Sequence, residues 1–176
     1  MNTRGQSAGN EVVLAYIAGF IDADGCICLS SHKRKSRNGE QRIIYLPSIS
    51  ASQTCSLTAD YLQENLLKMG FAVYRQAQLV NKANWTDRIL LEINGMKRCK
   101  PVLEALIPYL VTKKREAELL LDFINHRSVL CSRDPYGAKE ARIKYEMGFI
   151  KKHRNNGSDR AHKRLLNELE QTPVRA

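Results

Sequence analysis

The first hydrophobic stretch of the chain, from Val12 to Ile21, predicts a helix with one face lined by small side chains. Its small residues Ala15, Ala18 and Gly19 recur three or four positions apart, which places them on one side of a helix. Asn10 precedes the stretch and is a suitable N-cap, because its side-chain oxygen can accept a hydrogen bond from the first turn. Two helices of this kind could pack backbone against backbone.

A strand and a hairpin are expected next. Gly25 should end the helix as a C′ glycine, and the alternation from Cys26 to Ser30 then indicates a strand. The polar, basic segment 31–41 contains Asn38-Gly39, a pair typical of a hairpin turn. The returning strand, 42–53, ends in a period of two, with Ser48, Ser50 and Ser52 on one face and Ile49 and Ala51 on the other. One face of the hairpin should therefore be exposed to solvent and the other packed against the hydrophobic core.

The rest of the chain predicts helices around a second hairpin. Leu57–Met69 is amphipathic and is followed by the stop signal Gly70, and strands are expected at 71–80 and 85–93. Further helices are expected at 101–110, at 112–126 and, as two basic segments on either side of Asn155-Asn156-Gly157, from 138 to about 169. This order describes an α+β fold with one antiparallel sheet. A sheet whose open face carries Ser, Arg, Gln and Asn can lie in a DNA major groove.

Composition and charge narrow the class of protein. Of the 176 residues, 43% are hydrophobic and 26% charged, which is typical of a globular domain rather than a disordered chain. The net charge of +10 creates a potential that attracts polyanions, nucleic acid first. The cations are also clustered, at Lys33, Arg34, Lys35, Arg37 and Arg42, at Lys97, Arg98 and Lys100, at Lys113, Lys114 and Arg115, and across 151–164. Clustering of this kind favours a nucleic-acid surface over a merely solubilising charge.

The cysteines and the apolar segments indicate the cellular compartment in which we expect the protein. The five cysteines form no CxxC pair, so most are expected to be reduced thiols; Cys26 and Cys28 share one face of a strand, which is compatible with a soft metal but lacks a second ligand pair. No apolar run is long enough for a membrane span, and the N-terminal segment has no signal core. We therefore expect an intracellular protein, in the cytoplasm or nucleoid or in an organelle that holds a genome, neither secreted nor bound to a membrane.

The segment Ile17 to Gly25 reads IAGFIDADG and places two carboxylates, Asp22 and Asp24, at the end of the first helix. The negative end of the helix dipole disfavours an anion there, and a bound cation would reverse that preference. An ordinary acidic helix end is one alternative. A calcium loop is another, but its twelfth position counted from Asp22 is Lys33 rather than Glu, and its glycine comes too early.

This segment resembles the motif of the LAGLIDADG family, with Ile17 and Phe20 in place of two leucines, and the resemblance extends from about Leu14 to about Asn125. It implies an αββαββα core with helices packed on a saddle-shaped antiparallel four-stranded sheet, an endonuclease domain at 1–153 and a basic helical extension at 154–176. It also implies Mg²⁺, with Mn²⁺ as a substitute, held by Asp24 and the carbonyl of Ala23. With one motif copy, the chain would act as a homodimer whose motif helices meet through Ala15, Ala18, Gly19 and Asp22, although Asp22 looks more structural.

Other site residues follow from the resemblance. The family places a glutamine at the end of the second strand, where Gln53 stands, although a shift by one residue would select Thr54. A family lysine that follows a Pro-aromatic-Leu segment corresponds to Lys113 and could stabilise charge on the phosphate. The arginine often found a turn after the glutamine is absent, since Leu57 and Thr58 occupy that region. Asp24, Gln53 and Lys113 are therefore the predicted catalytic residues.

Base contacts are expected along the open face of the sheet. The candidates are Cys28, Ser30, His32 and Arg34 on the first strand, Ser48, Ser50 and Ser52 on the second, and Arg75 with Gln76 or Gln78 on the third. Arg42 and Arg88 are further candidates for DNA binding. Lys33, Lys35, Arg37 and the cations of the tail are expected to hold phosphates, which sets affinity without reading sequence.

The function predicted from the sequence is therefore metal-dependent cleavage of both strands of a long pseudo-palindromic DNA site. Two alternatives use the same scaffold: a maturase that assists splicing of its host intron RNA, and a DNA-binding regulator that has lost cleavage. Neither needs an intact Asp24, so the presence of Asp22, Asp24 and Lys113 favours the nuclease.

Overall fold

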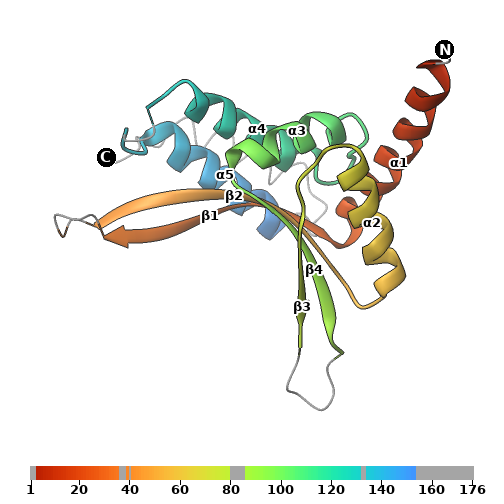
Figure 1. Cartoon of the computed structure of the whole chain (residues 1–176). Helices are drawn as coiled ribbons and strands as arrows, with labels where there is room; N and C mark the ends of the chain where they lie inside the picture. Colours follow the sequence, from red (N-terminus) through yellow and green to blue (C-terminus); the bar gives the residue numbers. More distant parts are fainter. Residues whose placement is uncertain (1–2, 36–38, 40, 80–85, 132–133, 154–176) are drawn as a thin grey trace.

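A computed structural model describes residues 3–35, 39, 41–79, 86–131 and 134–153, and the side chains from residue 9 onward. The elements in chain order are α1 (Thr3–Asp24), β1 (Gly25–Lys35), β2 (Gln41–Gln53), α2 (Ser56–Lys68), β3 (Tyr74–Gln78), β4 (Arg88–Asn94), α3 (Met96–Leu106), α4 (Lys114–Ser128) and α5 (Ala138–His153). The α+β class and the predicted order of elements are confirmed (Figure 1). The proposed extension, 154–176, lies outside the described residues.

The first helix differs from its prediction at both ends. It begins at Thr3, so Asn10 lies inside α1 and is not its N-cap; single polar residues differ by less than about 1 kcal/mol in helix propensity and need not interrupt a helix. Gly25 is absent from the described glycines with positive φ, so the prediction of a left-handed C′ glycine is wrong. A Cβ at Gly25 would lie 2.7 Å from Cα of Ile21, so glycine is required by close packing where α1 turns into β1.

The four strands form one antiparallel sheet in the order β1-β2-β4-β3. The two hairpins diverge from its centre, which gives the sheet the curvature of a saddle (Figure 1). The predicted alternation is confirmed, because Ile27, Leu29, Ile49, Ala51, Leu91 and Ile93 are buried on one face. Ser48, Ser50 and Ser52 point to the other face, as expected.

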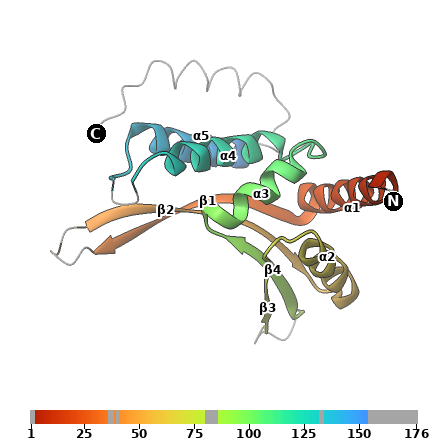
Figure 2. The ribbon, with the colours of Figure 1, turned by 45° about the horizontal axis from the view of Figure 1, so that its top comes forward.

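The helices cover the buried face of the sheet. In Figure 2, α4 and α5 lie side by side over the β1–β2 hairpin, while α1 and α2 lie toward the other end. A fully buried side chain, Phe123 of α4, contacts Tyr45 of β2 edge to face, with ring centroids 6.2 Å apart. The described residues include no helix with the length and apolar character that crossing a membrane requires.

An ion pair beneath this layer fastens α5 to α4. Arg127 and Glu140 are both almost fully buried, and Nη1 of Arg127 lies 3.2 Å from Oε1 of Glu140. The guanidinium also lies 4.3 Å from the ring centroid of Tyr136, and the N–H of Gly137 donates to Glu140 at 2.8 Å. Burial alone would raise the pKa of Glu140, but the bonds from Gly137 and Arg127 outweigh it and hold that pKa below its ordinary value.

Candidate functional site

Asp24 and Gln53 meet at the junction of α1 with the sheet. Asp24 is the last residue of α1 and its side chain is exposed, while Gln53 is the last residue of β2. Pairing of Gly25 with Ala51 aligns the two strands so that Nε2 of Gln53 donates to Oδ2 of Asp24 at 3.3 Å. The structure thus brings together two residues of the predicted site. Thr54, the alternative to Gln53, follows the strand and is exposed.

The neighbouring carboxylate, Asp22, faces into its own subunit. Its Oδ2 accepts the backbone N–H groups of Val111 at 2.7 Å and Thr112 at 3.2 Å, and its Oδ1 accepts that of Lys113 at 2.8 Å. These bonds tie the end of α1 to the start of α4. The contacts agree with the structural role expected for Asp22, because its carboxylate is turned toward the start of α4. Its place at a dimer interface stays a prediction.

Lys113 caps the carboxyl end of α1. Its side chain is only 5% exposed, and Nζ donates to the carbonyl oxygens of Ile21 at 2.8 Å and of Asp22, with Ala23 O more distant at 3.5 Å. The last carbonyls of a helix generally lack partners within the helix, and an ammonium also offsets the negative end of the helix dipole. Lys113 thus supplies the C-terminal cap that a left-handed glycine was expected to provide. Its catalytic role stays a prediction.

A cation from α5 reaches the same region. Lys151 Nζ lies 3.2 Å from Sγ of Cys26, which is two residues beyond Asp24. A hydrogen bond with Cys28 and the ammonium of Lys151 together lower the pKa of Cys26 to about 5, against the effect of burial. The sequence shows Lys151 only as part of a basic run, with nothing to place it here. Within the described part of the chain, no group of three or more His, Cys, Asp or Glu side chains is arranged to hold a metal ion.

The open face of the sheet carries most of the predicted base contacts. Strand register places Cys28 opposite Ser48, Ser30 opposite Leu46, His32 opposite Ile44, Arg34 opposite Arg42, Gln76 opposite Leu90, and Gln78 opposite Arg88. Both Gln76 and Gln78 therefore share the face of Ser50 and Ser52. Arg88 Nε donates to Oε1 of Gln78 at 2.8 Å. Whether these residues contact bases stays a prediction.

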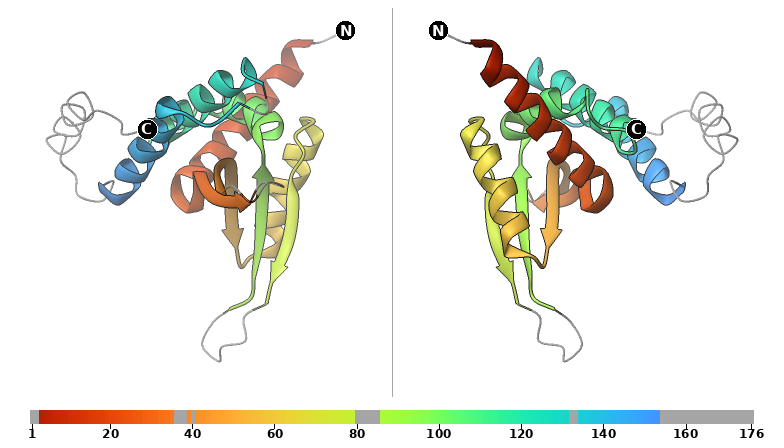
Figure 3. Two further views of the ribbon diagram at one scale, coloured as in Figure 1. Left: turned by 90° about the vertical axis from the view of Figure 1, so that its left-hand side faces the viewer. Right: turned by 90° about the vertical axis from the view of Figure 1, so that its right-hand side faces the viewer.

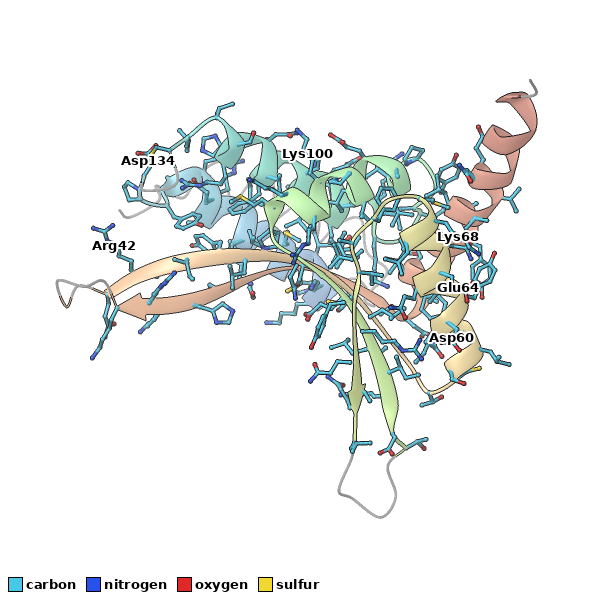
Figure 4. The ribbon with its side chains drawn as sticks, in the orientation of Figure 1. Arg42, Asp60, Glu64, Lys68, Lys100 and Asp134 are labelled. Carbon is cyan, nitrogen blue, oxygen red and sulfur yellow. The ribbon has the colours of Figure 1, made fainter. Side chains whose placement is uncertain are left out.

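Arg75 does not belong to this face. It pairs with Leu91, whose side chain is buried beneath the helices, and its Nη1 donates to Oδ1 of Asp60 and, at 3.0 Å, to Oε1 of Gln63. Asp60 lies on α2, close to the β3–β4 hairpin (Figure 4). The predicted place of Arg75 on the open face is wrong, because successive strand residues point to opposite faces and Arg75 falls on the side that packs against α2. Its contact with DNA stays a prediction.

The tip of the β1–β2 hairpin is exposed and basic. Arg34 and Arg42 form one of its last cross-strand rows, and Figure 4 shows Arg42 near the start of β2 at this tip. Lys33 pairs with Ile43, so it points away from the face of Arg34. His32 is also exposed, and its Nε2 lies 3.2 Å from Oγ of Ser30. Lys35 ends β1 and is exposed, whereas Arg37 lies outside the described residues.

Three residues of the open face were missed by the sequence patterns. Glu92 pairs with Ser50 on one side and Tyr74 on the other, and Asn94 pairs with Ser48. Alternation within Arg88–Asn94 could have placed Glu92 and Asn94, but only once the register between β2 and β4 was known. Tyr74 needed the register between β3 and β4 as well.

One side of α1 is left uncovered within the subunit. Figure 3 shows α1 in front in its right-hand view, without another described element over it. The exposed residues Val12, Ala15, Tyr16, Gly19 and Ala23 recur at helical spacing and define the α1 stripe. Ala18 is 0% exposed and packs inside its own subunit, so its predicted place at a dimer interface is wrong. Ala15 and Gly19 remain candidates.

Comparisons with known proteins agree with this geometry. The chain superposes on the homing endonuclease I-CvuI, in complex with its target in the presence of Ca, with a TM-score of 0.57, 21% identity and coverage of 94% of this chain and 99% of that one. It also superposes on the archaeal intron-encoded homing endonuclease I-Vdi141I, complexed with DNA, with a TM-score of 0.56, 13% identity and coverage of 92% and 99%. At these identities the likeness shows the fold.

No curated protein sequence matches the chain significantly. Residues 11–106, more than half of the chain, match the family model described as the LAGLIDADG-like domain. The saddle-shaped sheet, the motif helix that ends at Asp24 and this match together show that the chain belongs to the LAGLIDADG family.

Proposed function

We propose that this chain is a site-specific endonuclease that cuts both strands of a long pseudo-palindromic DNA target as a homodimer, by Mg²⁺-dependent phosphodiester hydrolysis. The observation that carries the proposal is the exposed carboxylate of Asp24, positioned by Gln53 at the edge of an open, polar sheet face. The homing endonucleases to which the fold is similar were crystallised with DNA, which supports DNA as the substrate. We place its action where target DNA is found, in the cytoplasm or nucleoid or in an organelle with a genome.

The residues at the end of α1 fit a hard divalent cation. Asp24 offers a carboxylate, and Ala23 offers the carbonyl that lies farthest from the Lys113 ammonium. Mg²⁺ needs few protein ligands because it keeps several waters and accepts phosphate oxygens. When bound, Mg²⁺, or Mn²⁺ in its place, would polarise the scissile phosphate and favour ionisation of a coordinated water.

The chain's own residues prepare this site for negative charge. Gln53 holds one oxygen of Asp24 and so restricts the carboxylate's orientation, while Lys113 offsets the helix carbonyls behind it. Lys113 is buried and bonded to these carbonyls, so its positive charge would act on the phosphate through its electrostatic field. Lys151 brings a further cation to the edge of β1, where it can hold a neighbouring phosphate.

A homodimer completes the site because one subunit supplies one motif. The α1 stripe is exposed and contains Ala15, Gly19 and Ala23, which would let a second α1 approach closely. A two-fold axis between the helices would place one Asp24 at each DNA strand and would match a pseudo-palindromic target.

The test uses the dimer, Mg²⁺ and a duplex made by joining the two DNA flanks of the reading frame. We expect both strands of the joined duplex to be cut and the interrupted allele to remain intact. Asp24→Asn should abolish cutting and preserve binding, whereas Asp122→Asn, a matched change on the outer surface, should preserve both. Binding without any Mg²⁺-dependent product would instead indicate a DNA-binding regulator. Splicing of a cognate intron RNA that survives Asp24→Asn would indicate a maturase.

A further inference from the structure

Glu92 is an acidic side chain near the middle of a surface proposed to bind a polyanion. It belongs to a cross-strand row that runs Cys26, Ser50, Glu92, Tyr74 across all four strands. The row begins two residues after Asp24, so it crosses the sheet near the predicted cleavage site rather than at a hairpin tip. Glu92 also borders two hollows of about 240 and 410 Å³, together with Asn94.

A carboxylate at this place opposes general DNA binding. The carboxylate of Glu92 and a phosphate carry like charges and repel each other, more strongly where solvent is excluded. Among the described residues Glu92 forms no hydrogen bond or ion pair, unlike Glu146 and Glu140 on the helices. The carboxylate is therefore available to accept hydrogen bonds from a ligand.

Base edges in the major groove differ in whether they suit a carboxylate. Cytosine presents the N4 amino group, a donor, with no acceptor beside it on the same base. Adenine also has an amino donor, N6, but its N7 acceptor lies next to it and would repel a carboxylate. Guanine and thymine present no major-groove amino donor at all.

We propose that Glu92 reads a cytosine in each half of the target, at a position near the centre of the site. This inference rests on the proposed function and adds a specificity residue to it. The carboxylate would stabilise the complex only where cytosine stands, and would repel the backbone or an acceptor elsewhere. Glu92 thus contributes by rejecting wrong sequences as well as by binding the right one.

The experiment selects bound duplexes from a randomised palindromic DNA library in Ca²⁺, with wild type, Glu92→Gln and Glu92→Ala. Wild type should enrich cytosine at one symmetric pair of positions, by about 5-fold to 150-fold over the other bases, which corresponds to one good base contact. Glu92→Gln should move that preference toward adenine, which offers a donor and an acceptor to an amide, and Glu92→Ala should erase it. The other positions should keep their preferences. Glu104→Gln on α3, whose partner is Lys100, is the matched control and should leave the whole profile unchanged.

Three results would overturn the inference. If Glu92→Ala strengthens binding to all sequences equally and keeps the wild-type profile, Glu92 only repels the backbone. If wild type enriches no sequence, the proposed site-specific function fails and the role of Glu92 fails with it. A wild-type profile that Glu92→Gln does not alter removes the role of Glu92 alone.

Discussion

Gln53 at the end of β2 donates a hydrogen bond to Asp24 at the end of α1, with 3.3 Å between Nε2 and Oδ2. The two residues are 29 positions apart in the chain, and the β1–β2 register is what brings them together. Loss of a partner that orients a metal-binding carboxylate typically reduces activity by 10-fold to 100-fold. We therefore expect Gln53→Ala to slow single-turnover DNA cleavage by about that factor.

Thr54→Ala is the control for this prediction, since Thr54 is the exposed neighbour of Gln53. It should leave the cleavage rate within about twofold of wild type, because surface changes of this kind are usually small. A larger effect for Thr54→Ala than for Gln53→Ala would mean that the hydrogen bond to Asp24 is not the functional contact.

Asp22 should matter for stability more than for chemistry. Asp22→Ala removes the acceptor of three backbone N–H groups, those of Val111, Thr112 and Lys113. Unsatisfied donors cost about 1 to 3 kcal/mol, so the free energy of unfolding should fall by about that amount. Urea unfolding followed by circular dichroism measures it. Asp24→Asn should leave the unfolding midpoint nearly unchanged, and an equal loss in both variants would contradict the assignment.

Gly19→Leu should separate the subunits without unfolding them. A Cβ added at Gly19 meets no atom within 4 Å in its own subunit, so a larger side chain is accommodated unless a partner lies against the α1 stripe. Overpacking a close interface costs about 1 to 3 kcal/mol, which is a rise of about 5-fold to 150-fold in the dimer dissociation constant. Sedimentation equilibrium measures this change.

Gly148→Leu is the matched control for the dimer test. Gly148 is also a helical, exposed glycine with open space around its Cβ, but it lies on α5. This variant should keep the wild-type association constant. A strictly monomeric wild type, or a Gly19→Leu variant that dimerises normally, would rule out the α1 stripe as the interface.

Lys151 should contribute to the salt dependence of DNA binding. Each lost phosphate contact lowers the slope of log K against log salt concentration by about 1, so Lys151→Ala should reduce the slope by about 1 for each contact that it makes. Filter binding at several salt concentrations provides the slope. Lys68→Ala, on the outer face of α2 beside Glu64, should leave it unchanged (Figure 4). An unchanged slope for Lys151→Ala would remove this lysine from the DNA surface.

The buried pair of Arg127 and Glu140 predicts how stability changes with pH. Because the pKa of Glu140 is lowered on folding, its ionised form stabilises the protein above the unfolded-state pKa, and this contribution is lost as pH falls through the folded-state pKa. Glu140→Gln leaves Arg127 without its buried anion and should lower the free energy of unfolding by about 3 to 5 kcal/mol at pH 7. Denaturation at pH 7, 5 and 3.5 should show this difference shrinking toward acid. A difference independent of pH would contradict the prediction.

Local patterns in the chain were enough to predict the elements and the chemistry of the motif. Period-two alternation identified the serines on the open face of β2, and the motif identified Asp24 as the carboxylate at the end of α1. Both signals come from residues that are close together in the sequence. Local patterns could not predict the hydrogen-bond partners of Asp22 and Lys113. The residues that they contact lie about 90 positions away, and no local pattern encodes such a contact.

Strand register decided the remaining assignments. Arg75 and Gln76 are neighbours in the chain, yet one packs against α2 and the other shares the open face, and a shift of one residue would exchange them. Glu92 likewise became visible only through its pairing with Ser50. Amino-acid type and periodicity set which elements form, whereas packing between distant segments sets which side chains lie on the open face of the sheet, against a helix or on the α1 stripe.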